Sequence, residues 1–352
     1  MLLSLFCGAG GLDVGFEAEN YEVELAFDLR QDSIASYNHN REKPSHGHVG
    51  DVSKLTLAEL DRLHGKTFAP EGVIGGPPCQ SFSRANTVYL DADPRHSLPL
   101  AYAELLKVLN DRNPVKFFVM ENVTGLMSER HAHRLRRYEK AFEEAGFSLS
   151  RSVLLATDYA TPQIRERLFV VGLNRELYGD AKWSPPAKVA TADGRRPDVR
   201  GAIGHLPDAT FFDRALEPSD IGFHPNHWCM RPKSKKFTTP GALRPGFGGN
   251  RSFKTLAWEN PSPTVAYGHR EVHVHPGCHR RLSVYEAMLL QGFPKDYELV
   301  GSLSSQIVQI SEAVPPPVAA AVAASVKAQV AALDAAKEVA EVVAKTKKRA
   351  RG

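Results

Sequence analysis

Short apolar runs alternate with amphipathic stretches from the first residue to about residue 175, and this rhythm constrains the fold more than any other feature of the chain. Such alternation is typical of parallel strands joined by crossover helices. It predicts an α/β protein with a mostly parallel sheet and helices on both faces. We expect strands at Leu2–Phe6, Val23–Phe27, Gly72–Gly75, Phe117–Glu121, Arg151–Ala156 and Leu168–Leu173, and helices near Gly11–Glu19, Gln31–Asn40, Leu98–Asn110 and His131–Ala145.

The rhythm stops between about Gly179 and Asn260, where Pro, Gly and basic residues dominate. This change predicts an inserted, loop-rich second domain. From Ile221 to Trp258 the segment contains no Asp or Glu, although the whole chain has a formal net charge of only +4. Its cations indicate a surface for a polyanion, with a solvated basic face as the alternative; they are Arg231, Lys233, Lys235, Lys236, Arg244, Arg251 and Lys254.

The C-terminal part returns to helical patterns. A helix is expected at Ser283–Gln291, because Gly292 and Pro294 follow it as stop signals. From Val318 the chain is rich in alanine, and an apolar stripe at three- and four-residue spacing predicts one long helix packed along another element. The stripe consists of Val318, Val322, Val326, Val330 and Leu333, and a basic tail ends the chain.

Cysteine usage and hydropathy exclude several classes of protein. The four cysteines, Cys7, Cys79, Cys229 and Cys278, show no disulfide-scaffold or zinc spacing, so no metal is expected. No apolar stretch approaches the ~18 residues that a membrane span needs, which favours a soluble protein. The first residues lack the basic start and long apolar core of an export signal, so we expect a cytoplasmic location.

A glycine turn, Phe6-Cys7-Gly8-Ala9-Gly10-Gly11, follows the first predicted strand and opens a helix. The dinucleotide fingerprint requires a third glycine where this chain has Asp13, which disfavours a nicotinamide cofactor. Asp28, about 20 residues downstream, suits a ribose, and Asp51-Val52 suits an adenine amino group. These residues indicate an adenosine-containing cofactor without pyrophosphate, such as S-adenosylmethionine; a tight turn with helix-capping aspartates is the alternative.

A proline-rich loop, Gly75-Gly76-Pro77-Pro78-Cys79-Gln80, follows a third apolar strand. It presents a thiol at the carboxyl edge of the sheet, where open α/β proteins bind ligands. Phe117–Met120 delivers Glu121-Asn122-Val123 to the same edge, and Gln163-Ile164-Arg165-Glu166-Arg167 precedes another strand. We therefore expect cysteine, glutamate and arginine to converge on one pocket.

At this point the chain resembles the DNA (cytosine-5) methyltransferase family, in its bacterial and phage restriction-modification form. The matching blocks keep the family order over Leu2 to about Val322: Phe6–Gly11, Asp28, Asp51, Pro77–Gln80, Asp93–Leu98, Glu121–Val123, Gln163–Arg167, Arg280-Arg281-Leu282 to Pro294, and Gln309–Pro316. The resemblance implies a Rossmann-like catalytic domain at 1–178, a target-recognition domain at 179–262, a return to the catalytic domain at 263–322, and a helical tail at 323–352.

The resemblance also implies residue roles. Cys79 would attack C6 of a cytosine flipped out of double-stranded DNA, Glu121 would contact N3 and the exocyclic amine, and Arg165 would bind O2. Arg167 would join them or form a structural ion pair. S-Adenosylmethionine would be bound by Phe6, Gly8, Gly10, Gly11, Asp28, Leu29, Asp51, Val52, Pro78, Leu98, Glu312, Ala313 and Val314. DNA would be contacted by Gln80, Ser83, Gln163 and Thr264, together with the seven cations of the basic segment.

One block departs from the family pattern, because Ser311-Glu312 stands where Gly-Asn is usual. Two alternatives stay open: a transfer-RNA cytosine-5 methyltransferase, which a Cys-Phe-Thr signature would favour, and a non-catalytic DNA-binding relative. Here the cysteine of the recognition region, Cys229, is followed by Met230-Arg231. A monomer is expected, with any cognate restriction endonuclease acting independently.

Overall fold

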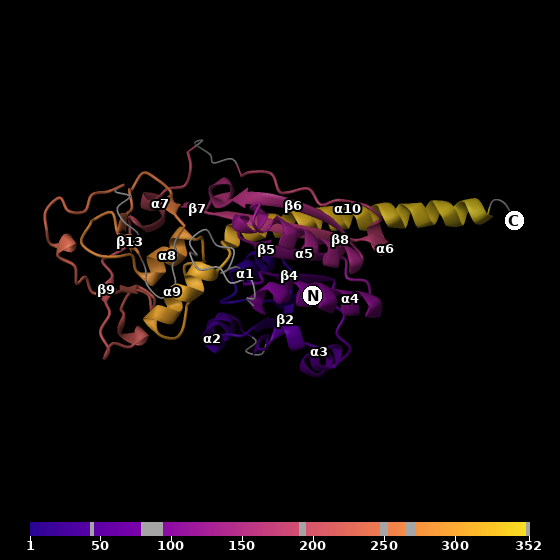
Figure 1. The fold of residues 1–352 in the computed structure, drawn as a ribbon, viewed down its shortest axis with the longest axis horizontal. Helices are drawn as coiled ribbons and strands as arrows, with labels where there is room; N and C mark the ends of the chain where they lie inside the picture. Colours follow the sequence, from indigo (N-terminus) through magenta and orange to yellow (C-terminus); the bar gives the residue numbers. More distant parts are fainter. Residues whose placement is uncertain (43–45, 79–93, 190–194, 247–252, 265–271, 350–352) are drawn as a thin grey trace.

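The computed structural model describes residues 1–42, 46–78, 94–189, 195–246, 253–264 and 272–349. It contains a sheet domain and a second, loop-rich lobe, and a long C-terminal helix leaves the sheet domain on the side away from that lobe (Figure 1). The predicted fold class, an α/β protein with a mostly parallel sheet, is confirmed.

The central sheet has seven strands in the order β3-β2-β1-β4-β5-β8-β6. The first five in this order run parallel, whereas β8 is antiparallel to both of its neighbours. Their bounds are β1 Leu2–Leu5, β2 Val23–Asp28, β3 Gly47–Val49, β4 Gly72–Gly75, β5 Phe117–Asn122, β6 Phe147–Leu155 and β8 Glu166–Asn174. All six strands expected above are present, and the short β3 ends just before Asp51.

Helices cover both faces of the sheet because the buried strands carry apolar residues on both faces. Leu2, Phe117 and Val119 face a core formed with α1 (Gly11–Ala18), α2 (Gln31–His39) and α10 (Pro316–Arg349). Leu3, Phe118 and Met120 face the opposite core. That core is completed by α3 (Leu57–His64), α4 (Leu98–Arg112) and α5 (Ala132–Glu144).

The first half of α10 packs against α1, as the apolar stripe predicted. Val318, Val322 and Val326 are fully or almost fully buried, and Leu333 is partly buried. A Cβ at Gly15 of α1 would lie 2.4 Å from the Ala319 Cβ, so the two helices approach each other as closely as a glycine and an alanine allow. The alanine-rich sequence therefore produces tight helix packing.

By length and composition, the segment Leu303–Val343 also qualifies as a membrane span, contrary to our expectation that no apolar stretch is long enough. The sequence analysis missed it because alanine contributes apolar character without a run of large side chains. A buried core helix meets the same criteria, and Val318, Val322 and Val326 lie in the core of the sheet domain. The segment is thus weak evidence for a membrane.

The second lobe, which we define as the described residues between 198 and 313, is rich in loops. It contains α7 (Val199–Ile203), α8 (Val284–Leu290), α9 (Leu303–Glu312) and the two-residue strands β9 Thr210–Phe211, β10 Trp228–Cys229, β11 Lys254–Thr255 and β13 His273–Val274. Its apolar core joins Trp228 and Leu256 to both α8 and α9. Trp183 belongs instead to the core of the sheet domain. Val199 and Leu282 belong to the core of the second lobe.

Candidate active site

The candidate site lies at the carboxyl edge of the parallel strands, as open α/β sheets predict. The glycine turn follows β1, Asp28 ends β2, Gly76-Pro77-Pro78 follows β4, and Glu121 lies at the end of β5. Since β1 is bonded to both β2 and β4, and β4 to β5, these four segments are neighbours in space.

The glycine turn is fixed by hydrogen bonds from neighbouring elements. The Gly8 amide donates to Asp28 Oδ2 at 3.0 Å, and the Arg30 amide donates to Asp28 Oδ1 at 2.8 Å. Gly8 has φ of 53°, and a Cβ there would meet no atom of the described residues within 4 Å. A Cβ on Gly11 would lie 2.4 Å from the Val314 carbonyl oxygen, so the final sequence block lies directly against the turn.

These residues fit an adenosine-containing cofactor. Gly8 faces open space, and the Asp28 carboxylate has acceptor capacity beyond its two backbone donors. Burial raises the pKa of Asp28, and the amides of Arg30 and Gly8 oppose that rise by stabilising the carboxylate. The Leu29 side chain, 63% exposed, offers an unusual apolar surface beside it.

The other expected cofactor residues lie around this edge with less distinctive roles. Asp51 caps the short helix Val52–Lys54 by accepting from the Ser53 amide at 3.0 Å, which is the capping alternative raised above. Val52 and Ala313 are buried, whereas Phe6, Pro78 and Leu98 are partly buried. Among the described residues, no group of three His, Cys, Asp or Glu is arranged to hold a metal ion.

Glu312, the departure from the family pattern, ends α9 and approaches the loop after β2. Its carboxylate lies 3.7 Å from Arg30 Nη1, and the two side chains are 45% and 36% exposed. A partly exposed ion pair of this length contributes at most about 1 kcal/mol. Arg30 also binds the Asp28 carboxylate through its backbone amide, which does not depend on Glu312.

We therefore expect Glu312→Asn to change the dissociation constant for S-adenosylmethionine by less than about tenfold, or ~1.4 kcal/mol. Calorimetric titration of both proteins measures this directly. Glu259→Gln, which removes an exposed ion-pair partner of Arg200, is the matched control. A loss well above tenfold for Glu312→Asn alone would mean that Glu312 binds the cofactor.

Glu121 forms a buried ion pair with Arg167 of β8, with 2.8 Å between Oε1 and Nε. A Cβ at Gly76 would lie 3.0 Å from Glu121 Oε2, so the carboxylate lies against the loop that leads to Cys79. Asn122 Nδ2 donates to the Pro77 carbonyl at 3.2 Å and ties β5 to that loop. Burial raises the pKa of Glu121, while Arg167 and then Arg165 oppose the rise.

Arg165 takes a different environment from Arg167. Its side chain is fully buried, and Nη2 donates to the carbonyls of Ser311 at 3.1 Å and Ala313 at 2.8 Å. Gln291, from the end of α8, accepts from Arg165 Nη1 and from Gln163 Nε2, each at 3.5 Å. Arg165 therefore joins the sheet domain to the end of α9, a contact that sequence reasoning missed.

The expected DNA-binding residues are distributed unevenly. Gln163 is fully buried in this structure. Thr264 is partly buried and donates to the Ile164 carbonyl at 2.8 Å. Lys254 is partly buried, and five cations of the basic segment are exposed: Arg231, Lys233, Lys235, Lys236 and Arg244. Cys79, Gln80, Ser83 and Arg251 lie outside the described residues.

Two of the remaining cysteines are buried in packing positions. Burial and the nearby Asp13 carboxylate raise the pKa of Cys7 well above its usual value. Cys229 is buried in the second lobe, where desolvation also raises its pKa. Both thiols are therefore held in their neutral, unreactive form.

Comparisons with known proteins bear on the whole chain. The profile of the family described as C-5 cytosine-specific DNA methylase matches residues 1–328. The Type II methyltransferase M.FnuDI of Fusobacterium nucleatum is 30% identical over 335 residues, covering 89% of this chain and 90% of the relative. The Type II methyltransferase M1.HphI of Haemophilus parahaemolyticus is 31% identical over 331 residues, covering 91% and 84%.

Solved structures share the fold. A prophage-encoded E. coli protein, whose crystal structure carries the description DNA modification methyltransferase, superposes with a TM-score of 0.72 at 22% identity, covering 93% of this chain and 98% of that one. The DNMT2 protein of Spodoptera frugiperda superposes with a TM-score of 0.63 at 15% identity, covering 92% and 98%.

Proposed function

The chain belongs to the C-5 cytosine-specific DNA methylase family, and from this premise we propose that it methylates C5 of a flipped cytosine within a specific double-stranded DNA sequence. The observation that carries the proposal is the Glu121–Arg167 pair, buried against the glycine that precedes the Pro-Pro-Cys loop. An acid and a cation beside the loop that leads to Cys79 support a contact with an extruded pyrimidine.

In this mechanism the Cys79 thiolate adds to C6 of the cytosine and forms a carbon–sulfur bond. Electron density moves from the C5–C6 double bond toward C5 and the N3–C4 part of the ring. Glu121, the pKa of whose carboxyl is raised by burial, hydrogen-bonds N3 and supplies a proton to it as negative charge develops there. After alkylation of C5, a base removes the C5 proton, the C5–C6 double bond re-forms, Cys79 leaves as thiolate and N3 returns its proton to Glu121.

We assign the contact with O2 of the base to Arg167 rather than Arg165. Arg167 pairs with Glu121, so its guanidinium lies beside the group that binds the same ring. Arg165 donates to two backbone carbonyls of the final block and serves as a positioning residue between that block and β8. This assignment exchanges the roles that the sequence resemblance implied.

S-Adenosylmethionine, when bound, supplies the methyl group. Gly8, Asp28 and Leu29 would hold it at the edge of the sheet, with Val314 closing the glycine turn from behind. Exposed cations of the second lobe would neutralise phosphates of the DNA and make its affinity depend on salt. We further propose a cytoplasmic, nucleoid-associated monomer, with any restriction endonuclease of a Type II system acting independently.

Expression of this chain in a host without cytosine-5 methylation tests the proposed function. Base-resolution mapping of 5-methylcytosine in the host DNA is expected to show modification at one short sequence. The Cys79→Ala variant, produced at the same level, controls for background. Absence of modified DNA, or 5-methylcytosine found only in RNA from the same cells, would refute the proposal.

A further inference from the structure

The second lobe contains an arginine whose guanidinium is held over two aromatic rings, and it lies outside the predicted recognition segment 179–262. We propose that Arg281 is a specificity-determining residue that reads a guanine in the DNA sequence. This inference rests on the proposed function and identifies which side chain selects the sequence. Neither the block Arg280-Arg281-Leu282 nor the basic composition of residues 221–258 assigned this role.

The cluster around Arg281 joins segments that are far apart in the chain. The Arg281 guanidinium carbon lies 5.1 Å from the centroid of the Phe253 ring and 5.9 Å from that of Phe237. The two rings are 5.7 Å apart, and Lys236 Nζ lies 4.7 Å from the Phe253 centroid. Two cations thus share an aromatic platform in the lobe that has the exposed basic residues.

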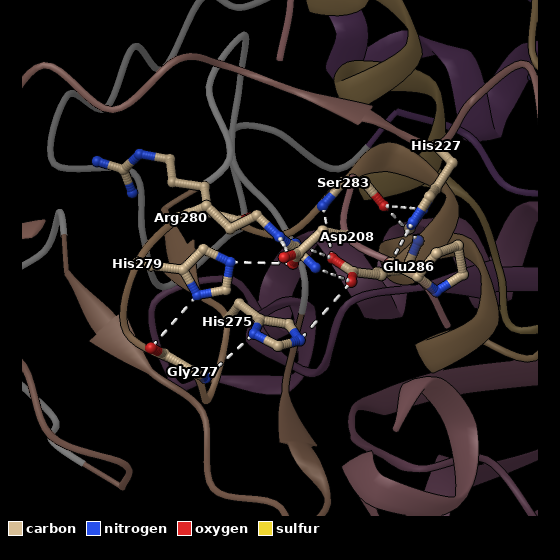
Figure 2. Close-up of polar contacts among 10 residues, drawn as sticks. Asp208, His227, His275, Gly277, His279, Arg280, Ser283 and Glu286 are labelled. Carbon is tan, nitrogen blue, oxygen red and sulfur yellow. Dashed lines mark hydrogen bonds and ion pairs between the residues drawn. The ribbon is translucent and has the colours of Figure 1, made fainter. Parts of the chain in front are cut away.

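A polar network surrounds Arg280, the residue that precedes Arg281 (Figure 2). Arg280 is buried and donates twice to the Glu286 carboxylate, at 2.8 Å for each bond. Its Nη1 also donates to the Arg281 carbonyl at 3.1 Å. Arg281 forms a β-bridge with Val274, and the capping box of Ser283 and Glu286 begins α8 directly after it.

Asp208 joins Arg280 and His279 in this network. Its carboxylate accepts from Arg280 Nε at 3.1 Å and lies 3.0 Å from His279 Nε2 (Figure 2). His275 Nε2 lies 3.8 Å from Glu286. These contacts anchor the main chain on both sides of Arg281, and the rings of Phe237 and Phe253 lie against its guanidinium.

A restricted guanidinium suits base recognition better than phosphate binding. Arginine forms two hydrogen bonds to O6 and N7 of guanine in the major groove, and that geometry requires a fixed, planar donor pair. Holding the side chain before binding reduces the entropy lost on binding. Phosphate contacts need only a positive charge at the right distance, for which the exposed Lys235 is sufficient.

Binding selection from a pool of randomised DNA duplexes tests the proposal with the full-length protein. The wild type is expected to enrich a defined sequence, and Arg281→Ala to lose preference for guanine at one position by about 10- to 100-fold, with other positions unchanged. Arg281→Lys keeps the charge and the contact with the rings but not the paired donors, so it should lose the same preference.

Lys235→Ala is the matched control. It should leave the enriched sequence unchanged and reduce the slope of log K against log salt by about 1. If both Arg281 variants enrich the same sequence as the wild type, the proposal is overturned. In that case a lower salt slope for Arg281→Ala would indicate a phosphate contact, and a lower melting temperature alone would indicate a packing role. No sequence preference in the wild type would overturn it too.

The readout separates this inference from the proposed function. Selection measures DNA binding, so it decides the role of Arg281 even for a protein that transfers no methyl group. Sequence-selective binding without 5-methylcytosine in the mapping experiment would refute the proposed methylation and leave Arg281 tested. Methylation at a defined sequence that Arg281→Lys preserves would refute only the role of Arg281.

Discussion

Replacing Cys79 by alanine is expected to lower the single-turnover rate of methyl transfer by a factor on the order of 10⁴ or more. Without the thiolate, nothing adds to C6, and C5 of cytosine stays a poor nucleophile. The rest of the site, including the Glu121–Arg167 pair and the Asp28 contacts, does not depend on the thiol. Binding of S-adenosylmethionine should therefore stay within a few-fold of the wild-type value.

Covalent trapping gives this prediction an independent readout. A duplex with 5-fluorocytosine at the target should form a stable adduct with the wild type in the presence of S-adenosylmethionine, because fluorine prevents removal of the C5 substituent. Cys278→Ala is the matched control, since Cys278 is partly exposed in the second lobe. Survival of the adduct in Cys79→Ala, or its loss in Cys278→Ala, would show that the nucleophile has been misassigned.

The second large effect is expected for Glu121→Gln, which should slow methyl transfer by about 100-fold or more, equivalent to ~2.7 kcal/mol. A glutamine amide can occupy the same space and form hydrogen bonds, but it cannot give a proton to N3. Its interaction with the ring therefore fails to strengthen as negative charge develops in the transition state. Affinity for DNA, which depends mainly on phosphate contacts, should change much less.

Glu166→Gln is the control, because Glu166 is an exposed carboxylate in the same sequence block. Rapid-quench measurement of a single turnover separates the chemical step from product release. A near-normal single-turnover rate for Glu121→Gln would contradict the proton-donor role. Equal losses in both variants would indicate a general effect of charge rather than a contact with the base.

The local sequence determined the elements and their order. Runs such as Phe117–Met120 are apolar on both strand faces, which requires a layer on each side and predicts the two-faced sheet. Glycine and proline predicted where α8 ends and where the loop before Cys79 lies, because these residues favour particular local backbone conformations. The helices α3 and α9 were missed, since their patterns are brief and their burial comes from distant partners.

The resemblance likewise brought Glu121 and the Pro-Pro-Cys loop to one edge, since adjacent parallel strands end together. It implied the contact with O2 for Arg165, whereas we propose Arg167 for that contact. Arg165 and Arg167 are two residues apart, so their side chains would lie on the same face of a regular strand. Arg165 instead lies between two strands, β7 (Gln163–Ile164) and β8. Arg167 then meets Glu121, while Arg165 meets the final block.

Only the tertiary structure decided the contacts between distant segments. Gln163 is buried because Gln291, 128 residues away in the chain, packs against it, and Arg281 is held by Phe237 and Phe253 from another part of the lobe. Periodicity and turn chemistry act over a few residues, so they fix strands, helices and loops. Which side chains meet across the fold depends on how those elements pack, and that information lies in the sequence as a whole rather than in any local pattern.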